Sequence, residues 1–180
     1  MLTLARLKQL RFSDPEPGWQ RTIAKLLTVN YTLARVEVII AGLDSLPQDR
    51  PVILAMNHTD RYNYWPFQWM MYRLGLPRYT ATWVKGKYFE NPLIGAFMLG
   101  ASNIPMPSRG YLIAGHVKQT LGAPPDGTTY RLLRDLLDGR VPPDTALTDT
   151  AARFVAGYGG VEGFLSALSG EFDAMMAEVM

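Results

Sequence analysis

The chain has 180 residues, of which 48% are apolar and 19% are charged, a balance that excludes intrinsic disorder and fits one folded domain. It contains no cysteine, which excludes disulfide scaffolds, thiolate metal sites and cysteine nucleophiles. Residues 1–125 carry 14 Lys and Arg against 7 Asp and Glu, whereas residues 126–180 carry 4 against 9. The basic first part suits an anionic partner such as phosphate, a membrane or nucleic acid, or is an ordinary solvated surface.

Two basic amphipathic helices are predicted at the start of the chain, over Leu2–Phe12 and Trp19–Arg35, with a turn between them. They either lie on an anionic membrane or cap the core. No apolar run reaches the roughly 18 residues that span a bilayer, and the N-terminus is a poor match to a signal peptide. We therefore expect a protein of the cytoplasm, in which residues 1–35 are a possible peripheral membrane anchor and residues 36–180 form one domain.

Strands alternate with helices after residue 35. Strands are expected at Val36–Ala41, Pro51–Met56, Tyr79–Val84 and Ala101–Met106, and helices at Tyr64–Leu74, Pro92–Leu99, Tyr111–Leu121 and Thr128–Leu137. The glycine-rich stretch after Val155 predicts a loop and then a helix that ends near the C-terminus. This order predicts an α/β fold with a mostly parallel sheet flanked by helices.

A histidine follows directly on one of the predicted strands. Pro51–Met56 leads into Asn57 and His58, with Asp60 and Asn63 close behind. Ligands of open α/β sheets bind at the carboxyl ends of strands. His58 is therefore either a general base with an orienting partner or a capping or core histidine.

The same stretch resembles the first conserved block of the glycerophospholipid acyltransferases, of which the lysophosphatidic acid acyltransferases are the best-known branch. That block is an apolar strand, then Asn-His, four further residues and an aspartate. Here Asn57 and His58 match, and Asn63 holds the place of the aspartate. The second block, a lysine before Pro-x-x-Gly and an arginine after a short strand, resembles Lys85 to Gly95 followed by Arg109, with Ser108 at the strict position of the arginine.

The resemblance, which covers roughly residues 35–110, implies acyl transfer from a thioester of coenzyme A or acyl carrier protein to a hydroxyl of a lysophospholipid or glycerol phosphate. His58 would be the general base, with Asp60 or Asn63 orienting it. Lys85 and Arg109 would bind the phosphate. The resemblance implies no metal and no cofactor besides the thioester co-substrate, and a membrane surface as partner.

Three departures from the family keep a second hypothesis open. Asparagine at position 63 accepts a hydrogen bond but cannot offset a forming positive charge; the comparable change costs serine proteases about 10⁴ in rate. No Phe-Pro-Glu-Gly-Thr block occurs between Gly110 and Met180, and 180 residues is short for the family. The resemblance thus implies a divergent or truncated member of the family, either an active enzyme or an impaired relative that acts as a lipid-binding or membrane-interaction module.

The segment from Tyr62 to Phe97 is rich in aromatic residues and methionine. It predicts either a well-filled core or a groove for an acyl chain. Stacking of single-stranded nucleic acid on these rings is disfavoured, since no RNA-binding motif accompanies them. The sequence does not indicate an oligomeric state.

Overall fold

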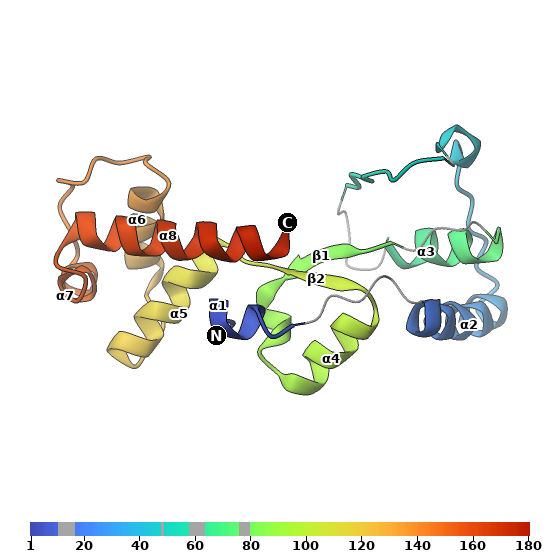
Figure 1. The fold of residues 1–180 in the computed structure, drawn as a ribbon, viewed down its shortest axis with the longest axis horizontal. Helices are drawn as coiled ribbons and strands as arrows, with labels where there is room; N and C mark the ends of the chain where they lie inside the picture. Colours follow the sequence, from blue (N-terminus) through green and yellow to red (C-terminus); the bar gives the residue numbers. More distant parts are fainter. Residues whose placement is uncertain (11–16, 48, 58–63, 76–79) are drawn as a thin grey trace. The chain divides into compact units, whose positions relative to one another are not determined.

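The computed structural model describes residues 1–10, 17–47, 49–57, 64–75 and 80–180, and the chain forms two compact units (Figure 1). The smaller unit is Asp14–Ala81, and the larger unit joins Met1–Ser13 to Thr82–Met180. The predicted α/β class is confirmed: helices flank a parallel pair of strands. The predicted boundary between residues 35 and 36 stays a prediction.

The smaller unit is built on two helices that pack together, α2 (Pro17–Leu33) and α3 (Tyr64–Arg73). Trp69 of α3 is buried; its ring meets Tyr31 edge-on at 4.9 Å, and its Nε1 donates a hydrogen bond of 2.9 Å to Thr28 Oγ1. Both the ring packing and the hydrogen bond of the indole nitrogen are thus made with α2, and together they fix how the two helices pack.

Two of the predicted strands do not form within the described residues. Residues 36–40 and 51–57 have no regular secondary structure and pair with no strand, and a 3-10 turn, η1 (Leu43–Ser45), lies between them. Their apolar side chains include some of the most exposed in the chain, such as Ile53 at 84%. β-branched composition indicates an extended backbone, but a strand also needs a hydrogen-bonding neighbour, and local sequence does not supply one.

The sheet of the larger unit is a βαβ element. β1 (Thr82–Lys85) leads through the 3-10 turn η2 (Gly86–Phe89) and α4 (Pro92–Gly100) to β2 (Asn103–Met106), which lies parallel to β1 with Lys85 opposite Met106. Asn91 caps α4 by accepting hydrogen bonds from the backbone of Leu93 and Ile94. A strand, a crossover helix and a parallel strand are what the sequence predicted for this segment.

A helical layer completes the larger unit: α5 (Arg109–Leu121), α6 (Gly127–Leu137), α7 (Asp149–Ala156) and α8 (Val161–Val179). One apolar core joins these four helices around Phe154 and Phe164. A second core joins the other end of α8 to the N-terminal α1 (Leu4–Leu7) and to Phe89, with Leu2 and Leu7 fully buried. Both leucines of α1, Leu4 and Leu7, therefore pack in the core.

Candidate active site

The predicted catalytic residues His58, Asp60 and Asn63 lie outside the residues that the structure describes, so their arrangement stays a prediction. Asn57 is the last described residue before them and is exposed at the end of the segment 51–57, which has no regular secondary structure. The strand that the sequence predicted over Pro51–Met56, leading into this position, is not formed.

Lys85 is the last residue of β1 and its side chain is exposed. The chain turns directly after it at Gly86, where a Cβ atom would lie 3.3 Å from Leu2 Cδ2 and 3.4 Å from the carbonyl oxygen of Met106. A larger residue at position 86 would therefore be tight against the Leu2 side chain and in contact with the backbone of β2. Lys85 itself lies at the carboxyl edge of the sheet.

Arg109 begins α5, three residues after β2 ends. Because parallel strands end at one edge of a sheet, and Lys85 lies opposite Met106, the structure brings Lys85 and the start of α5 to the same edge. Ser108, at the strict family position of the arginine, is the N-cap of α5 and its hydroxyl accepts from the backbone nitrogen of Tyr111 at 3.2 Å. Helix capping explains a serine at this position.

The guanidinium of Arg109 is held by a carboxylate that the sequence analysis missed. Its Nη1 donates to Asp138 Oδ1 at 3.3 Å, and its guanidinium carbon lies 5.1 Å from the ring centre of Phe172. Nε of Arg109 is buried and has no hydrogen-bond partner among the described residues. The side chain is therefore fixed by one ion pair and one aromatic ring, and retains an unused donor.

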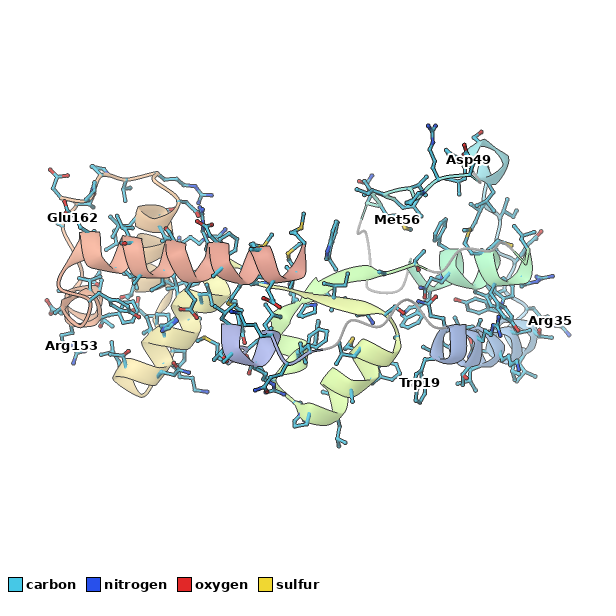
Figure 2. All side chains as sticks on the ribbon, in the orientation of Figure 1. Trp19, Arg35, Asp49, Met56, Arg153 and Glu162 are labelled. Atoms are coloured by element: carbon cyan, nitrogen blue, oxygen red, sulfur yellow. The ribbon has the colours of Figure 1, made fainter. Side chains whose placement is uncertain are left out.

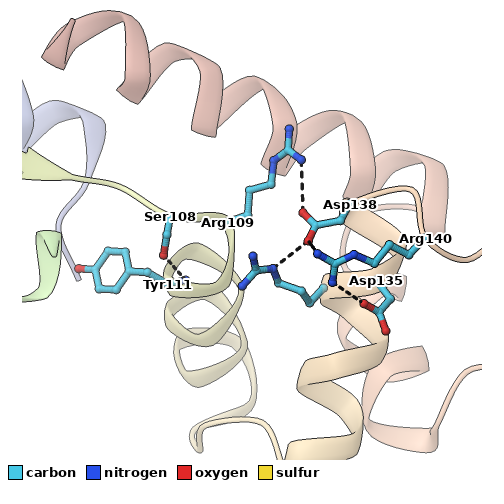
Figure 3. A network of polar contacts seen from close by, with 7 residues as sticks. Ser108, Arg109, Tyr111, Asp135, Asp138 and Arg140 are labelled. Atoms are coloured by element: carbon cyan, nitrogen blue, oxygen red, sulfur yellow. Dashed lines mark hydrogen bonds and ion pairs between the residues drawn. The ribbon is translucent and has the colours of Figure 1, made fainter. Parts of the chain in front are cut away.

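Asp138 is the centre of a network of charges (Figure 3). Besides Arg109 it binds Arg134 Nε at 3.0 Å and Arg140 Nη2 at 3.2 Å, and Arg140 also binds Asp135 at 3.0 Å. Burial of Asp138 acts to raise the pKa of its carboxyl, but hydrogen bonds from Arg134 and Arg109 outweigh burial, and the pKa is lowered. Three guanidinium groups face two carboxylates here, which leaves a net positive charge.

One signal in the sequence could have found part of this network. Arg134 and Asp138 are four residues apart on one helix, the spacing at which opposite charges meet. The pairing of Arg109 with Asp138 joins two helices across 29 positions, and no local pattern predicts it.

The described residues contain no group of three His, Cys, Asp or Glu side chains that could hold a metal ion. Among the helices in the described ranges, none has both the length and the apolar character needed to cross a membrane.

Comparison with families of known proteins matches residues 37–120 to the family described as Acyltransferase. The match contains Asn57, Lys85 and Arg109 in the predicted order, together with position 58. The resemblance proposed from the sequence is thus confirmed over this segment, and it supports a general role in acyl transfer. No curated protein and no solved structure matches the chain.

Proposed function

Because residues 37–120 are a segment of the acyltransferase family, we propose that the chain moves a fatty acyl group from a thioester to a hydroxyl of a lysophospholipid or glycerol phosphate. The observation that carries the proposal is this family match, which spans the predicted base and both predicted phosphate ligands. The donor is a thioester of coenzyme A or of acyl carrier protein.

His58 is the general base in this proposal. A neutral imidazole takes the proton of the acceptor hydroxyl as the oxygen attacks the thioester carbonyl. The carbon–sulfur bond then breaks, and the imidazolium returns its proton to the leaving thiolate, so the products are an ester and a free thiol. Asp60 or Asn63 orients the imidazole through its second nitrogen.

Lys85 and Arg109 bind the phosphate of the acceptor. Lys85 contributes an exposed point charge at the carboxyl edge of the sheet. Arg109 begins a helix at the same edge, and its guanidinium keeps a positive charge there while its buried Nε has no partner among the described side chains and backbone. Asp138 occupies another part of the same guanidinium, and we expect it to hold the arginine in position.

A membrane surface is the proposed location of the acceptor, with the protein on the cytoplasmic face. Helix α2 exposes an apolar stripe of Trp19, Leu26, Val29 and Leu33, and Trp19 projects from the side of the helix away from α3 (Figure 2). Arg21 and Lys25 are exposed on the same helix, which has no acidic residue. An apolar stripe with flanking cations suits the interface of an anionic membrane.

The second candidate function is a binding protein that keeps the acyltransferase scaffold without its activity. Asn63 favours it, because an asparagine cannot offset the imidazolium charge that develops in the reaction. Lipid would then bind and leave unchanged.

Thiol release from a long-chain acyl-coenzyme A, with and without lysophosphatidic acid, separates the two functions. We expect release that depends on the acceptor in the native chain and falls at least about a hundredfold in His58→Ala. His116→Gln is the matched control, since His116 is paired with Glu171 in the helical layer and should keep activity.

A third variant, Asn63→Asp, restores the carboxylate of the family and should raise the rate of release. Suppose that the native chain binds acyl-coenzyme A and lysophosphatidic acid but releases no thiol, whereas Asn63→Asp releases thiol. The binding function is then correct for the native chain. Release that persists in His58→Ala would overturn the assignment of the base.

A further inference from the structure

Helix α4 presents an apolar face to solvent in the larger unit. Leu93 is 82% exposed, and Ile94 and Phe97 are also exposed, at spacings that place all three on one side of the helix. The opposite side is fixed by Gly95, where a Cβ atom would lie 3.4 Å from Cα of Phe89. Gly95 is buried, so its side of α4 packs on the core and the side with Leu93 faces outward.

No charged residue interrupts this surface. The nine residues of α4 contain none, and Glu90 is the one Asp or Glu of the sequence between residues 82 and 125. The carboxylate of Glu90 is used within the fold, since it accepts a hydrogen bond of 2.6 Å from the hydroxyl of Tyr111. Exposed apolar surface of this kind marks a site of interaction.

Basic side chains lie near the start of α4. Lys85 and Lys87 are exposed just before α4, and Nζ of Lys87 lies 5.6 Å from the ring centre of Tyr88, itself exposed. From the N-terminal segment, Arg6 donates a hydrogen bond of 3.2 Å to the carbonyl oxygen of Glu90, which brings another cation close to the start of α4. We call the exposed surface of Lys85, Lys87, Tyr88, Leu93, Ile94 and Phe97 the α4 face.

We propose that the α4 face docks on an anionic lipid bilayer. The apolar side chains enter the interface, Tyr88 lies at the level of the head groups, and the lysines meet lipid phosphates. Charge complementarity favours this partner. Basic side chains beside exposed apolar ones fit an anionic lipid surface, whereas a second copy of the chain would bring lysine against lysine.

The role of this docking in acyl transfer rests on the proposed function, because docking through α4 would bring Lys85 close to acceptor lipids. The contact itself requires no catalysis and is tested separately. It adds a second membrane-contacting helix to α2, in the other unit of the chain.

Single cysteines give a direct test, since the native chain has none. Leu93→Cys is labelled with an environment-sensitive fluorophore, and Met180→Cys is the matched control because both native side chains are 82% exposed. With vesicles of phosphatidylcholine and phosphatidylglycerol, we expect a blue shift and quenching by lipid-borne quenchers at position 93 only. Pure phosphatidylcholine vesicles should give a much weaker response.

Vesicle co-sedimentation measures the contribution of the face to binding. Removing two apolar side chains in Leu93→Ser/Phe97→Ser should weaken binding at least about tenfold, whereas Met180→Ser should bind as the native chain does. Equal binding by the double variant and the native chain overturns the proposal. A label at position 93 that is already blue-shifted before vesicles are added also overturns the proposal. It would mean that protein covers the α4 face, either another copy of the chain or the smaller unit.

Activity separates this inference from the proposed function. With a short-chain acceptor dissolved in water, Leu93→Ser/Phe97→Ser should release thiol at the native rate, and with acceptor in vesicles it should be slower. Native protein that releases no thiol from any acceptor but binds vesicles through Leu93 would overturn the enzyme and keep the α4 face.

Discussion

Asp138 shows how a single carboxylate can organise a basic site. Its side chain is 12% exposed and binds three arginines that come from α5, from α6 and from the turn after α6. Removing the negative charge would leave three guanidinium groups close together with only Asp135 to offset them. Asp138 therefore stabilises the fold and at the same time fixes Arg109 at the edge of the sheet.

We predict that Asp138→Asn lowers the free energy of unfolding at neutral pH by on the order of 2 kcal/mol, because hydrogen bonds to charged groups are lost. The folded-state pKa of Asp138 is lowered, so its stabilising contribution is complete above the unfolded-state pKa of about 3.9 and is lost as the pH falls through the folded value. The native chain should thus lose stability below about pH 4, and the variant should lose less. Urea unfolding between neutral and acid pH checks both effects.

Asp135→Asn is the control for this prediction. Asp135 pairs with Arg140 at a more exposed position, and exposed ion pairs contribute about 0–1 kcal/mol. A change as large as that of Asp138→Asn would mean that net charge, and not the network around Asp138, determines stability.

At the candidate site, the residues that belong to short motifs were predicted from the sequence, whereas a contact between distant parts of the chain was not. Asn57, Lys85 and Arg109 are recognisable from short motifs, and the family match covers them. The carboxylate that binds Arg109 comes from a helix outside the matched segment, so no motif contains both partners. Arg109 was for this reason assigned to phosphate binding from the sequence, and its carboxylate partner was not found.

At the scale of elements, helices were predicted better than strands. α2, α3, α4, α5 and α6 begin and end within about two residues of the predicted bounds, because their caps and apolar spacing are local signals. The βαβ element was also found, through its short strands on either side of α4. The segments 36–41 and 51–56 have the composition of strands but lack a partner among the described residues, and partners are set by distant parts of the chain.

Helix α7 was not predicted, although its signals are present. Thr148 accepts a hydrogen bond from Ala151 N at 3.2 Å as the N-cap, and the buried residues Ala151, Phe154 and Val155 follow helical spacing. Its eight residues are short for a periodicity argument. The Thr148 hydroxyl also lies 3.0 Å from Oγ1 of buried Thr129, so the first turns of α6 and α7 are linked.

We predict that Thr148→Ala destabilises the protein by about 1 kcal/mol, the usual cost of a lost N-cap. Thr148→Ser keeps the hydroxyl and should lose much less. Thermal unfolding followed by circular dichroism compares the two. Equal losses for alanine and serine would show that the methyl group of Thr148, and not its hydroxyl, matters at this position.

At the scale of the whole molecule, α8 connects the sheet, α1 and the helical layer of the larger unit. No Phe-Pro-Glu-Gly-Thr block follows Arg109, and the sheet among the described residues has two strands. In the larger unit, α8 packs on β2, on α1 and on the helical layer, so one 19-residue helix contributes to both apolar cores. His116 of α5 meets this helix at Glu171, with 2.7 Å between Nε2 and Oε2.

We predict that the two cores of the larger unit unfold together because α8 runs through both. Phe164 is buried in the core of the helical layer and Met175 in the core with α1 and Phe89. Phe164→Ala should cost about 3–5 kcal/mol and Met175→Ala about 2–5 kcal/mol, through lost burial and the cavities left behind. Each should shift one transition that fluorescence of Trp83 and far-ultraviolet circular dichroism report alike, measured in a background where the other three tryptophans are replaced by phenylalanine.

Met180→Ala, which removes an exposed apolar side chain at the end of the same helix, should leave that transition in place. If Phe164→Ala shifted the circular dichroism signal but not Trp83, the helical layer would unfold without the sheet. The helix would then connect two independent cores instead of joining them into one cooperative structure, and damage to the helical layer would leave the edge with Lys85 intact.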